Sequence, residues 1–326
     1  MSCKEIDLID RFFNKMQKTR QDVIMGVGDD CALLSTNKEE LIAVSTDTLI
    51  AGKHFMPDIH PTDLGYKSLA VNLSDLASMG ADPAWLSLAI TLPSINEDWL
   101  ASFSKSLFRE LNYHNMQLIG GDITCGPLSL TMTIQGKVPF GCALTRHGAC
   151  VGDRIYVTGT LGDSAAGLAI LQKRLRIFNL QDRQYLLSRH LRPQPRILQG
   201  KALRNIASAA IDISDGAIMD LNHILVRSNC GACINLDSIP YSLALLRHSN
   251  QDQALHWALS GGEDYELCFT VSPINDRLLG NIVADLNCTN TSFTCIGYII
   301  PKNEGIQFMR NNKKVEYSWS GYTHFK

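Results

Sequence analysis

Two kinds of apolar periodicity alternate along the chain, and this alternation restricts the protein to folds in which helices pack against sheets. Apolar side chains recur at helical spacing over residues 62–79, and the run stops at Gly80 and Pro83, which commonly follow a helix. Over residues 128–134, Leu, Met and Ile instead alternate with Ser and Thr, which predicts a strand with one exposed face. Further strands are predicted at residues 41–48, 84–92, 116–120 and 154–158, and further helices at residues 6–16, 94–111 and 164–171. The predicted fold class is therefore α/β, of the α+β type.

The length of the chain and a change in its pattern predict two domains. A single hydrophobic core stops growing at about 250–300 residues, and this chain has 326. Over residues 138–153 the regular patterns give way to Pro, Gly and other small residues, and strand–helix alternation resumes afterwards. We therefore expect an N-terminal domain over residues 1–140 and a C-terminal α/β domain over residues 150–326.

Charge and hydropathy exclude several classes of protein. The net charge is −2, from 30 basic and 32 acidic side chains, and no Lys/Arg block predicts binding to nucleic acid or to an anionic membrane. The longest apolar stretches, residues 86–92 and 295–301, are too short to cross a bilayer. Acidic residues within the first seven positions break any apolar signal-peptide segment. We therefore expect a cytoplasmic protein.

Ten cysteines are scattered along the chain without a disulfide framework. Cys230 and Cys233 form a single C-x-x-C pair, and no second pair follows at the spacing of a zinc ribbon. Such a pair could be redox-active or could bind a metal. In a reducing cytosol, however, unpaired thiols are the more common case, and we expect them here.

Aspartates occur in small-residue settings where predicted strands or helices end. A single aspartate in such a place is more often a helix cap or a turn residue than a ligand. Several of them together favour a ligand site, because open α/β sheets bind ligands at strand ends and because carboxylate and hydroxyl oxygens suit Mg²⁺. The five segments are residues 28–30 (GDD), 45–48 (STDT), 72–75 (NLSD), 120–122 (GGD) and 212–216 (DISDG).

The common nucleotide-binding motifs are absent from the sequence. No Gly-x-x-x-x-Gly-Lys-Ser/Thr segment occurs, and the pair Gly26 and Gly28 lacks the third glycine of a dinucleotide fingerprint. The His-Arg-Asp and Asp-Phe-Gly motifs of protein kinases are also missing. A nucleotide would therefore bind by a route other than a P-loop.

Eight segments together resemble the thiamine-monophosphate kinase family, in order over residues 6–322. The two longest, residues 67–83 (KSLAVNLSDLASMGADP) and 260–266 (SGGEDYE), are specific, whereas a single Gly-Asp pair is not. The others are residues 28–32, 45–48, 120–122, 158–164, 190–193 and 212–216. The family shares a superfamily with aminoimidazole ribonucleotide synthetase and selenophosphate synthetase. The resemblance implies that superfamily's two-domain fold, a homodimer formed through an N-terminal domain that also binds ATP and Mg²⁺, and an ATP site without a P-loop.

The resemblance also implies roles for individual residues, and each implied ligand has a plainer alternative. Arg146 could be a surface residue near the domain boundary, His54 a packed histidine, and Trp319 a contact that docks the C-terminal segment. The implied metal ligands are Asp30, Ser45, Thr46, Asp47, Asp75, Asp122, Asp212 and Asp215; the ATP contacts are Gly121, Asp122, Arg146 and Ser214; the substrate contacts are His54, Glu263 and Trp319. No role is assigned to residues 190–193.

The implied reaction is ATP-dependent phosphorylation of thiamine monophosphate by direct in-line transfer on several Mg²⁺ ions. The second pKa of a phosphate monoester is about 6, so the acceptor oxygen is already an anion at neutral pH. No covalent or general-base residue is therefore expected. Two alternatives stay open: a related ATP-dependent synthetase of the same superfamily, and a regulatory module that binds Mg-nucleotide. Selenophosphate synthetases rely on a reactive cysteine or selenocysteine near a Gly-rich N-terminal segment. Neither Cys3 nor Cys31 lies in such a segment, which argues against that synthetase.

Overall fold

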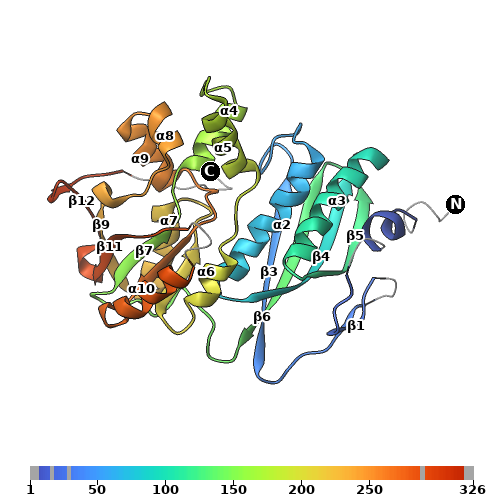
Figure 1. Cartoon of the computed structure of the whole chain (residues 1–326), viewed down its shortest axis with the longest axis horizontal. Coiled ribbons are helices and arrows are strands. Elements are labelled where there is room, and N and C mark those ends of the chain that lie inside the picture. Colours follow the sequence, from blue (N-terminus) through green and yellow to red (C-terminus); the bar gives the residue numbers. More distant parts are fainter. Residues whose placement is uncertain (1–6, 15–17, 28–30, 287–290, 319–326) are drawn as a thin grey trace. The chain divides into compact units, whose positions relative to one another are not determined.

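The computed structural model describes residues 7–14, 18–27, 31–286 and 291–318. The chain divides into two compact units. The first comprises Met1–Leu76 and Ala81–Gly141, and the second comprises Ala77–Gly80 and Cys142–Lys326. Each unit combines a sheet with helices, so the predicted α/β class is confirmed (Figure 1).

The first unit is built on a four-stranded sheet in the order β3 (Glu40–Ile50), β6 (Ser129–Pro139), β4 (Asp82–Leu92), β5 (Gln117–Cys125). Only β4 and β5 are parallel to each other. Helices α2 (Pro61–Ser78) and α3 (Glu97–Tyr113) cover one face of this sheet (Figure 1). The predicted helices and strands of this region are confirmed. The helix predicted from residue 94 begins at Glu97, and its cap is Asn96, whose side chain accepts a hydrogen bond from Trp99 N at 3.0 Å.

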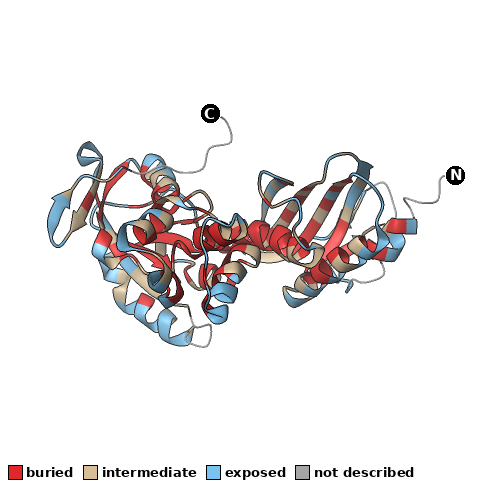
Figure 2. Cartoon of the chain, turned by 90° about the horizontal axis from the view of Figure 1, so that it is seen from above, coloured by how far each residue is buried: buried red, intermediate tan, exposed pale blue. Residues whose placement is uncertain are grey.

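Strand alternation gives this sheet a buried face and a more open one. Leu130, Met132 and Ile134 of β6 are fully buried on the side of the helices. Strand alternation places the threonines between them on the opposite side, which we call the second face. Buried and less buried positions accordingly alternate along the strands of this sheet (Figure 2). The short strands β1 (Val23–Met25) and β2 (Leu33–Leu34) pack over Trp85 and Ile119 on the second face. A π-helical turn, η1 (Asp10–Asn14), precedes β1.

The second unit is built on a seven-stranded sheet whose pairs are antiparallel, apart from the parallel pair β12–β9. The order is β13 (Lys313–Val315), β12 (Ile306–Arg310), β9 (Cys230–Asn235), β11 (Phe293–Pro301), β7 (Arg154–Thr158), β10 (Leu267–Val271), β8 (Ala207–Asp212). The helices are α4 (Asp163–Leu171), α5 (Leu180–Leu191), α6 (Ile197–Ala202), α7 (Ala217–Ser228), α8 (Leu243–His248), α9 (Gln251–Ser260) and α10 (Asp276–Asp285). Short 3₁₀ turns are η2 (Leu236–Ser238), η3 (Pro273–Asn275) and η5 (Lys302–Glu304).

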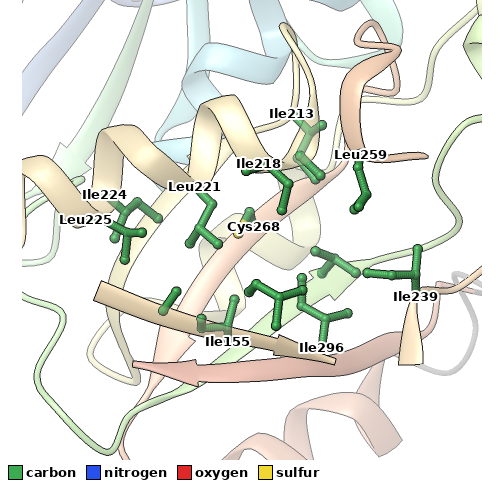
Figure 3. Packing of buried hydrophobic residues seen from close by; sticks show 14 of the residues in the cluster. Ile155, Ile213, Ile218, Leu221, Ile224, Leu225, Ile239, Leu259, Cys268 and Ile296 are labelled. Atoms are coloured by element: carbon green, nitrogen blue, oxygen red, sulfur yellow. The ribbon is translucent and has the colours of Figure 1, made fainter. Parts of the chain in front are cut away.

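The core of the second unit lies between α7 and the sheet. Ile218, Leu221 and Leu225 of α7 point toward the strands, where they meet Ile155 and Ile296 (Figure 3). All five side chains are nearly or fully buried. This packing fixes α7 against the sheet and thereby places the loop that leads from β8 into α7.

Cys230 and Cys233 both lie on β9 and are free, buried thiols, so the expectation of unpaired cysteines is confirmed for this pair. Residues three positions apart on a strand point to opposite faces of the sheet, which separates the two sulfur atoms. Within the described ranges, none of the helices combines the length and the apolar character needed to cross a membrane.

Candidate active site

Three predicted metal ligands of the first unit lie on the side of the sheet that faces the helices. The Ser45 hydroxyl donates a short hydrogen bond to the carboxylate of Asp75, which joins β3 to α2. Asp47 follows Ser45 by two positions on β3, and alternation therefore directs it to the same face. This arrangement places oxygen donors of the kind that Mg²⁺ prefers on neighbouring elements.

Thr46 lies on the second face of the sheet. Its hydroxyl is 2.9 Å from that of Thr133 on β6, and Thr48 makes the same contact with Thr131. The side chain of Thr46 therefore points away from those of Ser45 and Asp47. The structure brings Ser45 and Asp75 together but does not bring the Thr46 side chain to them.

Asp122 lies far from this group within one chain. It is on β5, at the opposite edge of the four-stranded sheet from β3. Three strand spacings of about 4.8 Å separate the two edges by roughly 14 Å. Asp122 is paired with Ala89 and lies on the second face, in the same row as Thr131 and Thr48. Asp122 and Asp47 of a single chain are therefore too far apart to bind one metal ion.

A bulge in β5 sets the direction of the Asp122 side chain. Leu118 is opposite Leu86 and Gly120 is opposite Ser87, so β5 contains one extra residue at this point. Gly121 follows with φ of +155°, and a Cβ placed on it would lie 1.8 Å from the carbonyl oxygen of Leu88. Only glycine can occupy this position without moving the backbone of β4.

A cavity of about 620 Å³ adjoins this bulge in the first unit. Its lining is largely apolar and includes two predicted ATP contacts, Gly121 and Asp122. The apolar part comes from Phe13 in η1, from Ala32 and from Leu88 and Ile90 of β4, among others. A largely apolar lining with a few polar groups is typical of a small-molecule site.

In the second unit, β8 ends at Asp212, and the loop that follows carries Ser214 and Asp215. The carboxylate of Asp220 in α7 holds this loop, because one of its oxygens accepts hydrogen bonds from three consecutive backbone N–H groups. These are the N–H groups of Ser214 (3.0 Å), Asp215 (3.0 Å) and Gly216 (3.1 Å). Burial raises the pKa of Asp220 to about 7, although the three amides oppose the shift. Asp220 was not among the predicted site residues; it lies in the first turn of α7, where an acidic side chain is a common helix cap.

Glu263 is brought to this loop by backbone hydrogen bonds. Its N–H donates to the carbonyl of Ser214 at 2.8 Å, and the N–H of Tyr265 donates to Ile213 at 2.9 Å. Glu263 has φ of +57° and Tyr265 has φ of +51°, a left-handed conformation that is uncommon outside glycine. Strained residues of this kind concentrate at functional sites. The predicted substrate contact Glu263 and the predicted ATP contact Ser214 are therefore neighbours.

Two other predicted contacts lie apart from these groups. Arg146 is exposed, and its carbonyl accepts a hydrogen bond from Ser228 at the C-terminal end of α7. The 12 residues of α7 span about 18 Å, which separates the Arg146 backbone from the loop of Ser214. In the first unit, His54 Nδ1 accepts from Ile50 N at 3.0 Å, so the proton of the neutral ring is on Nε2. Asp30 and Trp319 lie outside the described residues.

Among the residues that the structure describes, no three His, Cys, Asp or Glu side chains lie close enough together to hold a metal ion. Ser45, Asp47 and Asp75 belong to one unit, and Asp212 and Asp215 to the other. The sequence pattern favoured a shared ligand site because most of the aspartate segments follow predicted strands, and open α/β sheets bind ligands at the carboxyl ends of their strands. The seven-stranded sheet is instead largely antiparallel, so the carboxyl ends of neighbouring strands point in opposite directions.

Comparisons with known proteins agree along the whole chain. Residues 28–138 match the family model of the AIR synthase related protein, N-terminal domain. The thiamine-monophosphate kinase of Escherichia coli strain K12 is 59% identical over 325 residues, which cover 100% of this chain and 99% of that protein. The crystal structure of the thiamine-monophosphate kinase from Stenotrophomonas maltophilia K279a is 43% identical, with a TM-score of 0.83 over 91% of this chain and 93% of that one. This chain belongs to the thiamine-monophosphate kinase family.

A further solved structure carries ligands. AaThiL complexed with AMPPCP and TMP is 29% identical to this chain, with a TM-score of 0.76 over 98% of this chain and 96% of that one. The predicted membership of the thiamine-monophosphate kinase family is thus confirmed, and so is the predicted two-domain superfamily fold.

In this member of the thiamine-monophosphate kinase family, a buried charged network lies beneath Glu263. The fully buried carboxylate of Glu266 accepts hydrogen bonds from Arg189, Arg196 and Thr158. Burial by itself raises the pKa of Glu266, but the two guanidinium groups outweigh it and lower that pKa. Asp264 accepts from the backbone N–H groups of Gly162 and Ser164, and burial raises its pKa to about 8. Segment 260–266 was predicted only as a family motif, and nothing in its local pattern indicates this network, whose arginines lie about 70 positions away in the sequence.

Proposed function

We propose that this protein catalyses the phosphorylation of thiamine monophosphate by ATP, which gives thiamine diphosphate and ADP. The observation that carries the proposal is the identity of 59% to the E. coli thiamine-monophosphate kinase over the full length of both chains. The complex of AaThiL with AMPPCP and TMP supports the same pair of substrates. Gly121, Asp122, Ser214 and Arg146 are proposed to contact ATP, and His54, Glu263 and Trp319 to contact the acceptor.

The chemistry of the acceptor explains why no general base is needed. A phosphate oxygen is ionised at neutral pH, since the second pKa of a phosphate monoester is about 6. The main barrier is the repulsion between this anion and the triphosphate. The apolar cavity beside Gly121 and Asp122 supports binding of the adenine ring at that place. Direct in-line transfer, without a phosphorylated enzyme intermediate, is the proposed route.

Magnesium ions would cancel charge between the two phosphates when they are bound. The residues of the first unit fit Mg²⁺ chemically, because Ser45, Asp47 and Asp75 supply hard oxygen donors on adjacent elements. Asp30, Thr46, Asp122, Asp212 and Asp215 complete the proposed set of ligands. Thr46 would contribute through its carbonyl, because its side chain lies on the second face.

We also propose that the protein is a homodimer formed through the second face of the four-stranded sheet. Ile42 and Val44 lie on this face of β3 and are 45% and 61% exposed, and Ile50 at the end of the same row is 41% exposed. A row of exposed apolar side chains on a sheet face is typical of a protein interface. Analytical ultracentrifugation of the Val44→Asp variant should show monomers; a native protein that is already monomeric would contradict the proposal.

The catalytic proposal is tested by a direct assay. The protein is incubated with ATP, Mg²⁺ and thiamine monophosphate, and the products are separated by chromatography. Thiamine diphosphate and ADP should form in equal amounts, none should form when EDTA replaces Mg²⁺, and free thiamine should not be phosphorylated because an alcohol needs a base. ADP without thiamine diphosphate would favour a related synthetase. Binding of ATP without any turnover would favour a regulatory module.

The free thiols of Cys230 and Cys233 support a cytoplasmic location.

A further inference from the structure

His190 lies at the end of α5 with its ring buried against the segment that carries Glu263. Only 3% of the residue is exposed. Its Nδ1 atom is 3.3 Å from the Glu263 carboxylate oxygen Oε2 and 3.0 Å from the Ser164 hydroxyl oxygen. Ser164 is in the first turn of α4, so one ring nitrogen connects three separate segments of the second unit.

The chemistry of the contact places a proton on Nδ1. A carboxylate only accepts hydrogen bonds, and an unprotonated ring nitrogen at 3.3 Å would repel it. Nδ1 is therefore a donor that faces both the Glu263 carboxylate and the Ser164 hydroxyl. A hydrogen bond to an ionised acceptor is stronger and more directional than one between neutral groups.

The other carboxylates of this region have donors of their own. Glu266 is held by Arg189 and Arg196, and Asp264 by the backbone N–H groups of Gly162 and Ser164. Asp163 accepts from the hydroxyl groups of Thr160, Tyr185 and Ser242. These three buried acids are therefore held by donors other than His190, and the carboxylate that Nδ1 of His190 contacts is that of Glu263.

The packing of α4 against α5 prevents the ring from moving away. A Cβ added at Gly167 of α4 would lie 2.8 Å from the His190 Cβ and 2.3 Å from the carbonyl oxygen of Leu186. The two helices are thus in backbone contact at the residue that carries the imidazole. The Glu263 backbone is fixed as well, by its hydrogen bond to Ser214 and its left-handed conformation.

We propose that His190 is a positioning residue that orients the Glu263 carboxylate toward the acceptor substrate. The proposal rests on the function proposed above, in which Glu263 contacts thiamine monophosphate. The side chain of Glu263 is 27% exposed, so its carboxylate is open to a ligand while the imidazole behind it is not. An oriented carboxylate binds the acceptor without first losing rotamer freedom.

The test compares two amide replacements of His190 that differ in where they place a donor. The Asn amide nitrogen occupies nearly the place of Nδ1, whereas the Gln amide nitrogen reaches the place of Nε2, away from Glu263. His190→Gln should raise KM for thiamine monophosphate roughly tenfold, as expected for loss of a charge-assisted hydrogen bond, and His190→Asn should restore most of it. KM for ATP and Tm should be similar for the two variants. Equal KM values for the acceptor in Asn and Gln variants would overturn the proposal.

A double-mutant cycle with Glu263→Gln separates this proposal from the function on which it rests. If His190 acts through Glu263, His190→Gln should have little further effect on the acceptor KM in the Glu263→Gln background. Additive effects would mean that His190 acts by another route and would overturn the proposal. If Glu263→Gln alone leaves the acceptor KM unchanged, the proposed contact between Glu263 and the substrate is wrong. If Glu263→Gln raises KM but His190→Gln does not, only the positioning role fails.

Discussion

Replacement of Glu266 by Gln should destabilise the second unit more than any surface charge change. Glu266 is fully buried and accepts hydrogen bonds from Arg189 Nη2 (2.8 Å), Arg196 Nε (2.6 Å) and Thr158 Oγ1 (2.6 Å). Gln has nearly the same shape but keeps only one acceptor oxygen. Its amide group would face guanidinium donors, and both buried guanidinium groups would lose the carboxylate that they share; Arg189 Nε would keep only Asp163 Oδ2, at 3.7 Å.

The magnitude follows from the burial of both partners. Arg189 and Arg196 are each only 8% exposed, so water cannot replace the lost carboxylate. Removal of one member of a buried ion pair costs about 3–5 kcal/mol, because the remaining charge stays buried. For a unit of this size, such a loss corresponds to a decrease in Tm of about 6–20 °C. The matched control is Asp252→Asn in the exposed Arg310–Asp252 pair, for which less than about 1 kcal/mol is expected.

The assay combines thermal unfolding with hydrogen–deuterium exchange. Faster exchange should appear in peptides from β7 and β10, the strands that carry Thr158 and lead from Glu266. If Glu266→Gln and Asp252→Asn lower Tm by the same small amount, Glu266 does not serve as the counter-ion of the two arginines.

The same carboxylate predicts how stability depends on pH. The pKa of Glu266 is lowered in the folded protein, so folding favours its ionised form. Its contribution is therefore complete above the pKa of a free glutamate, about 4.3, and is lost as the pH falls through the lower folded value. Between about pH 5 and pH 3, native Tm should fall more steeply than that of Glu266→Gln. Equal slopes would contradict the assignment of the shift to the two arginines.

Three further outcomes are expected in the first unit. Gly121→Ala should weaken ATP binding strongly and separate β4 from β5, because the new Cβ would lie 1.8 Å from Leu88 O. The control is Gly120→Ala, whose Cβ would meet nothing within 4 Å. Equal ATP affinities of the two variants would refute this reasoning. Arg20 and then Lys137 hold the pKa of Asp22 well below its usual range. Asp22→Asn should therefore make Tm depend less steeply on pH below about pH 4. An unchanged slope of Tm against pH in differential scanning fluorimetry would contradict this. Asp47→Asn, Asp75→Asn and Asp122→Asn should each lower kcat by orders of magnitude while Tm is retained, in contrast to the exposed Asp58→Asn; near-normal turnover in all three would reject the metal assignment.

Local structure was largely readable from the sequence because it depends on neighbouring residues. The alternation over residues 128–134 predicted a half-exposed strand, and β6 buries Leu130, Met132 and Ile134 as that pattern requires. The predicted strand at residues 154–158 coincides with β7. The strand predicted at residues 116–120 is β5, but β5 continues to Cys125 because it pairs with β4 beyond the two glycines. That extension depends on a partner strand and is not encoded in local pattern.

The geometry of the candidate site was decided by contacts between distant parts of the chain. The segments that carry aspartates were visible as motifs, but strand order separates Asp122 from Asp47 and alternation separates Thr46 from Ser45. The residues that hold the site are likewise remote in sequence from what they hold. His190 is 73 positions from Glu263 by their residue numbers, and Glu266 is 77 from Arg189. Side chains that far apart meet only after sheets and helices have packed, so no periodicity or spacing in the sequence could assign those partners.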